Sequence, residues 1–238
     1  MDRGMRPRRV AVMQPYFFPY VGTYQLAAAV DEFVFLDDAA FMKKSYLNRN
    51  SILLDGAAHR FSVPVAQASQ NRAINAHSFT GDWSPLKRLL HNAYGRAPQA
   101  SRVLPLIDTV LDDPDENLAR KNARSMQAVF EYLGGGPRWT LASQRPSPDP
   151  ACRGQSRILH LCQAHGAEVY VNPPGGRALY DAARFAEQGV QLRFLAPQAL
   201  PYVQAAPAFV PWLSIIDLLM HLPPDEVRER LATYTLTD

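Results

Sequence analysis

The residues best suited to chemistry follow a short apolar run, Phe33 to Leu36. Two carboxylates, two ammonium groups and an Asn-Arg-Asn triplet come directly after it: Asp37, Asp38, Lys43, Lys44, Asn48, Arg49 and Asn50. Carboxylates at a strand end can act as a general base or hold a metal ion, while Lys and Arg can hold phosphate. The alternative is a solvated turn with ordinary salt bridges. The density of polar groups favours catalytic and substrate-binding roles.

A second candidate segment, from Gln14 to Gly22, reads Gln-Pro-Tyr-Phe-Phe-Pro-Tyr-Val-Gly. Its prolines fix φ and its aromatic rings offer flat surfaces, two of them with hydroxyls. Gly22 allows a tight entry into a helix whose N-terminus can face an anion. The alternative is a loop that packs the core, but packing alone does not require an amide and two phenols. The predicted substrate-binding residues are Gln14, Tyr16, Phe18 and Tyr20.

A third candidate segment is the Gly-rich loop from Asn172 to Gly176. Such loops let backbone N–H groups approach phosphates, although this one matches neither the dinucleotide nor the P-loop pattern. The alternative is an ordinary connection between strand and helix. Its predicted substrate-binding residues are Asn172, Gly175, Gly176 and, just beyond, Tyr180. His160 and Cys162 would face different sides of a helix, so no metal site is expected.

The elements that must position these segments alternate along the chain. Val10 to Met13 is typical of a buried strand, Gly22 to Val30 of a helix, and Phe33 to Leu36 of a second strand, which together make a parallel βαβ unit. Glu168 to Val171 predicts a later strand. If these strands are parallel, the three candidate segments converge beyond their carboxyl ends, where ligands bind in such sheets.

The rest of the chain predicts an α/β fold with a mixed, mostly parallel sheet. A hairpin is expected around Asp55-Gly56, a helical insertion at about 84–134, and a proline-containing loop or lid at 143–155. Two helices, Leu213 to Met220 and Pro224 to Tyr234, are expected to end the chain. We interpret residues 1–238 as one domain, with residues 1–8 disordered.

Composition narrows the function classes. The net charge of +3 is too small and too scattered to indicate nucleic-acid binding, although it suits an anionic small molecule. Two cysteines do not make a disulfide scaffold, and no apolar run is long enough to span a membrane. We therefore expect a cytoplasmic protein that binds a small molecule.

The run from Met13 to Leu53 resembles the opening of the WbqC-like protein family, whose members typically read Gln-Pro-x-Phe-Phe-Pro-Tyr and, later, Asn-Arg-Asn. The resemblance continues at Val63 to Val65, Trp83, Ala167 to Tyr180 and Leu213 to Leu219. Two positions depart from the pattern. Tyr46 stands where members often have Trp, and Ser-Pro-Leu-Lys follows Trp83 where members often have His.

The resemblance implies a role in bacterial surface-glycan synthesis, with glycine transfer to an amino sugar as the suggested activity. Amide formation needs an activated acyl donor, for which an acyl or aminoacyl carrier is a candidate partner, and a base, for which the candidates are Asp37, Asp38 and His91. Asn48, Asn50 or backbone N–H groups can stabilise an oxyanion. The cationic side chains can hold the diphosphate of a nucleotide sugar. Two alternatives stay open: an ATP-dependent nucleotidyltransferase or amide ligase, and a non-catalytic protein that binds a nucleotide sugar or glycan.

Overall fold

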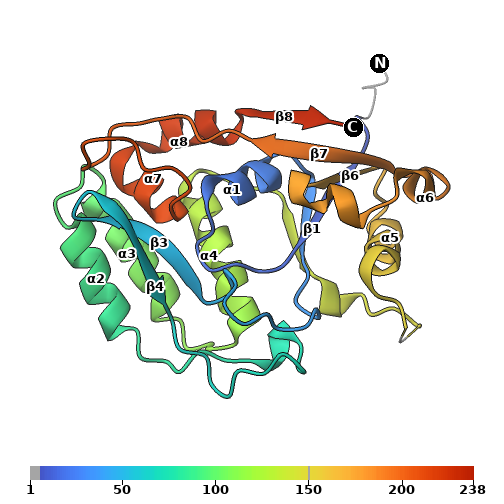
Figure 1. Cartoon of the computed structure of the whole chain (residues 1–238), viewed down its shortest axis with the longest axis horizontal. Helices are drawn as coiled ribbons and strands as arrows, with labels where there is room; N and C mark the ends of the chain where they lie inside the picture. Colours follow the sequence, from blue (N-terminus) through green and yellow to red (C-terminus); the bar gives the residue numbers. More distant parts are fainter. Residues whose placement is uncertain (1–5, 150) are drawn as a thin grey trace.

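The computed structural model describes residues 6–149 and 151–238, and its centre is a six-stranded sheet (Figure 1). Its strands are β1 (Arg9–Met13), β2 (Glu32–Phe35), β5 (Arg138–Leu141), β6 (Val169–Asn172), β7 (Gln191–Pro197) and β8 (Tyr234–Thr237). They lie in the order β5-β2-β1-β6-β7-β8; the first five run parallel to their neighbours, and β8 pairs antiparallel with β7. The predicted mixed, mostly parallel α/β sheet is confirmed.

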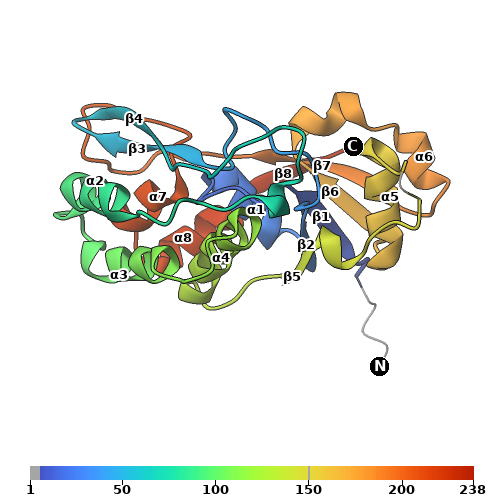
Figure 2. The ribbon, with the colours of Figure 1, turned by 90° about the horizontal axis from the view of Figure 1, so that it is seen from below.

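Helices cover both faces of the sheet, because side chains alternate between the faces along each strand. Ala11 packs in the core that lies beneath α1 (Val21–Ala28), α4 (Leu118–Tyr132), α7 (Ile215–His221) and α8 (Pro224–Leu231). Val10 and Val12 pack on the other face, against α5 (Gly154–Ala164) and α6 (Ala182–Ala186). Figure 2 shows the two helical layers on opposite sides of the strands.

The predicted helical region is present as α2 (Ser84–Tyr94), α3 (Ala100–Leu111) and α4. It lies beside the sheet, together with the hairpin of β3 (Arg49–Leu54) and β4 (Ala57–Ser62) (Figure 1). Asp55 and Gly56 both have positive φ, 50° and 74°, as a two-residue hairpin turn requires. Three short 3₁₀ turns complete the connections: η1 (Ile74–Ala76), η2 (Ala142–Gln144) and η3 (Pro174–Leu179).

The predicted helix from Pro224 to Tyr234 is wrong at its end. The helix α8 ends at Leu231, and Tyr234–Thr237 form β8 against β7. Alternating Thr side chains suit a pleated strand, and pairing with the edge of β7 outweighs continuation of the helical pattern.

The predicted disorder of residues 1–8 falls partly outside the described residues, which begin at Arg6. Arg6 forms an ion pair with Asp31, at 2.5 Å, and Arg8 forms one with Glu32, at 2.6 Å. Residues 6–8 are therefore tied to the start of β2 rather than detached from the fold.

Glu32 is the centre of a buried polar cluster at the amino ends of the strands. Its carboxylate accepts hydrogen bonds from Arg8 and from Thr140, at 2.6 Å each, and lies 2.9 Å from Nδ1 of His165. Burial alone would raise the pKa of Glu32, but these hydrogen bonds and the nearby cations hold it below the ordinary 4.5. Burial lowers the pKa of His165 below 6.5, although Glu32 opposes the change.

Both shifts predict loss of stability in acid. His165 is preferred neutral in the folded state, so its protonation costs stability as pH falls below 6.5. Glu32 contributes stability above its ordinary pKa of 4.5, and that contribution is lost as pH falls through its lower folded value. Urea unfolding should show that Glu32→Gln is less stable than wild type at about pH 7 and that the difference narrows towards about pH 3. An unchanged difference across that range would contradict the role of Glu32.

Candidate functional site

The carboxyl ends of β1, β2 and β6 meet at one edge of the sheet, as the sequence predicts. β1 lies between β2 and β6 and is parallel to both, so Gln14, Asp37 and Asn172 mark neighbouring strand ends. From β1 the chain adds β2 and β5 on one side and β6 and β7 on the other. Open α/β sheets bind ligands at such a switch point. We call this region the carboxyl edge.

Asp37 is buried at this edge, with 1% of its surface exposed. Oδ1 accepts from the backbone N–H of Ser143 at 2.9 Å, and Oδ2 accepts from the Ser143 hydroxyl at 2.6 Å and from Asn75 Nδ2 at 3.1 Å. Asp37 therefore joins the ends of β2 and β5 to η1. With these bonds formed, its carboxylate is closed to a ligand.

Asp38 is placed differently, although it is the next residue. Its side chain is 30% exposed, and Oδ2 accepts a hydrogen bond of 2.6 Å from the Arg157 guanidinium. Within the described residues, Oδ1 accepts no hydrogen bond. One oxygen is thus held in position, while the other is available to a ligand.

Arg157 is a functional candidate that the sequence reasoning missed. It lies in the first turns of α5 and its side chain is only 9% exposed. Besides Asp38, its guanidinium donates to the carbonyls of Ala142 and Arg145, at 2.8 Å each. A cation on the buried stripe of a helix is the signal that could have identified it, because buried Arg is rare unless paired.

A pocket of about 660 Å³ opens beside this ion pair. We call it the α5 pocket, since it lies between the end of β2, the start of α5 and the end of η3. Its lining includes Asp38, Arg157, Arg153, Cys152 and Tyr180. Part of the loop predicted as a lid, the described residues 146, 147, 149 and 152–155, forms one wall. Among the described residues, no side chain caps the first turn of α5, so its N–H groups stay available.

Asn50, the last residue of the Asn-Arg-Asn triplet, holds the segment from Gln14 to Gly22, which we call the aromatic loop. Asn50 Nδ2 donates to the carbonyls of Phe17 and Phe18, at 3.2 and 2.7 Å, and Asn48 Nδ2 donates to Val63 O at 2.8 Å. Both N–H groups of the Asn50 amide are thereby engaged, which leaves Asn50 unsuited to an oxyanion, whereas the Asn48 amide keeps one N–H. Arg49 is half-buried and has no hydrogen-bond or ion-pair partner within the described residues.

Phe18 lies in the core rather than on a ligand surface. It is fully buried despite a φ of 39°, a conformation that costs a bulky residue free energy. Its N–H donates to Ser125 Oγ, and its carbonyl accepts from Asn50 and from Ser214 Oγ. Packing, the alternative considered for this loop, therefore accounts for Phe18.

Tyr16 and Tyr20 remain half-exposed at the carboxyl edge. The Tyr16 hydroxyl donates to Gln14 Oε1 at 3.4 Å. Burial, and then the neighbouring phenols, raise the pKa of both tyrosines above 10. A Cβ on Gly22 would lie 2.4 Å from the Tyr20 ring, so glycine is needed there to seat the ring.

Asn122, on α4, is another residue that the sequence reasoning missed. It is fully buried, and its Nδ2 donates to the carbonyls of Pro15 and Leu47, at 2.9 and 2.7 Å. Asn122 thus joins the segment after β1, which contains Pro15, to the segment after β2, which contains Leu47. Lys43 and Lys44 lie on the segment after β2, and both are exposed.

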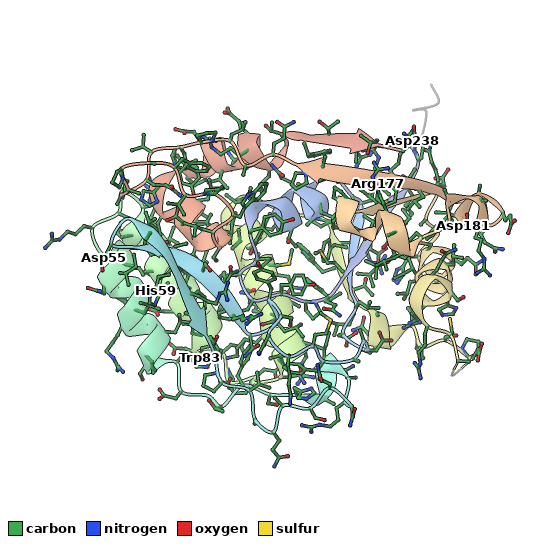
Figure 3. The ribbon with its side chains drawn as sticks, in the orientation of Figure 1. Asp55, His59, Trp83, Arg177, Asp181 and Asp238 are labelled. Carbon is green, nitrogen blue, oxygen red and sulfur yellow. The ribbon has the colours of Figure 1, made fainter. Side chains whose placement is uncertain are left out.

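The Gly-rich loop has one tightly packed position and one open position. Asn172 Oδ1 accepts from the Tyr170 hydroxyl at 3.1 Å, and a Cβ on Gly176 would lie 1.8 Å from Asn172 Nδ2. Gly175 faces open space. The next residue after Gly176, Arg177, donates to the Asp238 carbonyl, and Figure 3 shows the two at the same end of the molecule.

His91 is not brought to the carboxyl edge. It is exposed on α2, where its Nε2 lies 3.9 Å from Asp108. Figures 1 and 2 place α2 at the opposite end of the molecule from α5. A base role for His91 stays a sequence prediction that its position does not support.

Two kinds of feature are absent from the part of the chain that the structure describes. It contains no group of three or more His, Cys, Asp or Glu side chains arranged to hold a metal ion. Across the same residues, no helix has the length and apolar character needed to cross a membrane.

The fold and the site define a class: an α/β protein with a doubly wound sheet and, at its carboxyl edge, a pocket that contains an Asp–Arg ion pair. Residues 14–229 match the WbqC-like protein family, and the chain belongs to that family. An uncharacterized protein of Mycobacterium tuberculosis, Rv1507c, is 28% identical over 229 residues, which are 93% of this chain and 98% of that protein. No solved structure gives a significant match.

Proposed function

We propose that this WbqC-like protein is an acyl- or aminoacyltransferase that forms an amide on an amino sugar or a related amine. The observation that carries the proposal is the contrast between two consecutive carboxylates. Asp37 is closed by three hydrogen bonds, whereas Asp38 offers Oδ1 to the α5 pocket. The volume of that pocket, about 660 Å³, is within the range of small-molecule sites.

The reaction needs one bond made and one broken. The amine nitrogen attacks the carbonyl of an activated acyl donor, the new C–N bond forms, and the bond to the leaving group breaks. The attacking amine gives up a proton, which Asp38 Oδ1 accepts. Arg157 holds the other oxygen of Asp38, so the carboxylate cannot turn away from the pocket.

The oxyanion that forms on the acyl carbon needs hydrogen-bond donors. Both N–H groups of Asn50 already donate to backbone carbonyls, and neither Asn48 nor Asn50 lines the α5 pocket, so the uncapped N–H groups at the start of α5 are better candidates. Arg153 lines the same pocket and supplies positive charge for a phosphate on either substrate.

Mass spectrometry tests the proposal directly. The protein is incubated with nucleotide-linked amino sugars, activated glycyl donors and ATP, each combination in turn. The expected result is an acceptor that gains one acyl group without ATP, with glycine as the first acyl group to try. AMP release that requires ATP would select a ligase instead. Tight binding with no product from any combination would select a non-catalytic binding protein.

Arg49 provides a separate prediction about phosphate binding. Because its guanidinium is half-buried and has no described partner, we expect Arg49→Ala to weaken binding of a phosphate-bearing substrate by about 1.5–3 kcal/mol, as for a charge-assisted hydrogen bond. Calorimetry measures the affinity. Arg60→Ala, on the neighbouring strand of the same hairpin, is the matched control and should bind as wild type. Equal affinities of the two variants would refute the assignment.

A further inference from the structure

Four aromatic rings form two edge-to-face pairs at the carboxyl edge, and the sequence predicted only Tyr16 and Tyr20 among them. Tyr16 and Tyr46 meet edge to face with centroids 6.1 Å apart, and Tyr20 and Trp212 meet in the same way at 5.8 Å. Burial is the main cause that raises the pKa of Tyr16, and the phenols of Tyr20 and Tyr46 raise it further. The hydroxyls of these three tyrosines therefore lie near one another. We call these four residues the aromatic platform.

Two of the four rings are more exposed to solvent than large aromatic side chains usually are. Tyr46 is 58% exposed and Trp212 is 53% exposed. Tyr16 and Tyr20 are held more firmly, since the Tyr20 ring packs over Gly22 and the Tyr16 hydroxyl donates to Gln14 Oε1. The Tyr46 carbonyl accepts a hydrogen bond from Phe17 N–H, at 3.2 Å. A surface with a fixed base and exposed outer rings is suited to stack on a flat ligand.

Backbone strain occurs at this surface. Trp212, in the platform, and Lys44, two residues before Tyr46, have positive φ values of 62° and 61°. Each such residue costs about 1–3 kcal/mol, and strain of this kind gathers at ligand-binding sites. These two strained residues indicate that the fold keeps the platform in its conformation at a cost in free energy.

Positive charge accompanies the rings. Lys43 and Lys44 are exposed within three residues of Tyr46, and neither has an ion-pair partner within the described part of the chain. Ammonium groups beside aromatic faces fit a ligand that combines a planar ring with phosphates. The position also agrees, because the platform follows β1, the strand at the switch point of the sheet.

We propose that the aromatic platform, with Lys43 and Lys44, binds the nucleoside diphosphate part of an activated sugar. The base stacks on the exposed rings of Tyr46 and Trp212, and the diphosphate pairs with the lysines. This inference rests on the proposed function in one respect: the amino sugar that the α5 pocket receives is taken to be attached to the nucleoside diphosphate. Binding to the platform requires no catalysis.

Tryptophan fluorescence tests the inference with UDP and ADP as probes. Of the three tryptophans, Trp83 is buried, Trp139 is partly buried against the core and Trp212 is exposed, so the Trp212→Phe variant identifies the signal that belongs to the platform. We expect a saturable change in wild type that is lost in Trp212→Phe. Calorimetry should show that Tyr46→Ala weakens UDP binding about tenfold, since one stacking side chain contributes ~1–3 kcal/mol. Uridine and pyrophosphate should each bind more weakly than UDP.

Two further variants separate the interactions. The double variant Lys43→Gln with Lys44→Asn removes the charge while Asn tolerates the positive φ, and it should weaken UDP binding and flatten its salt dependence. Val203→Ala, at an exposed apolar residue outside the platform, should bind as wild type.

Asp38→Asn separates the inference from the proposed function, because it should bind UDP normally even without turnover. If neither nucleotide binds, or if Tyr46→Ala binds as wild type, the platform assignment is overturned. Amide formation on a free amino sugar would then leave the proposed function standing.

Discussion

Asp38→Asn is expected to lower amide-forming turnover by about 10²–10⁴-fold, the usual contribution of a positioned general base. Its melting temperature should stay close to that of wild type. The amide that replaces the carboxylate retains an oxygen that can accept from Arg157, whose guanidinium also keeps its bonds to two carbonyls. Mass-spectrometric rates and thermal unfolding measure the two properties. Unchanged turnover would remove Asp38 from the reaction.

Asp37→Asn is the matched control, and it should show the opposite pattern. An amide at position 37 has one acceptor atom where the carboxylate has two, so a donor from Ser143 or Asn75 is left facing an NH₂ group. An unpaired buried donor costs about 1–3 kcal/mol of folding free energy. Turnover per folded molecule should fall less than in Asp38→Asn. If Asp37→Asn were stable and inactive, the roles of the two carboxylates would be reversed.

The second large effect is expected for Asn122→Ala. This change leaves the buried carbonyls of Pro15 and Leu47 without their donor, and each unsatisfied group costs about 1–3 kcal/mol. We therefore expect a total loss of about 2–6 kcal/mol in the free energy of unfolding. Urea denaturation at neutral pH measures it.

Gln127→Ala is the control for Asn122→Ala. Gln127 lies on the same helix, is half-buried, and makes no side-chain hydrogen bond among the residues that the structure describes. It should lose little stability. Equal losses in the two variants would mean that the two hydrogen bonds of Asn122 contribute nothing measurable to the free energy of unfolding.

The strands and their meeting point could be predicted because the relevant signals are local. Val10 to Met13 and Phe33 to Leu36 are apolar without a break, as strands covered on both faces must be. Parallel pairing then brings their ends to one edge. Asp55-Gly56 predicted its hairpin for an equally local reason, since both positions need positive φ.

The division of roles within the site could not be predicted, because it depends on which hydrogen bonds are already made. Asn50 and Asp38 are both polar residues near a strand end, yet Asn50 donates to Phe17 and Phe18, while Oδ1 of Asp38 stays open to the pocket. Arg157 and Asn122 lie on helices far along the chain. Only the tertiary fold brings them to the edge.

The aromatic loop also has a consequence for how the chain reaches its folded state. Pro15 is held by a residue 107 positions later, and the carbonyl of Phe18 by one 196 positions later. Contacts between such distant residues form slowly, since long loops must close first. The loop that follows the first strand can therefore be completed only when α4 and the start of α7 have been synthesised and docked. The earliest part of the candidate site to leave the ribosome is among the last to take its final form.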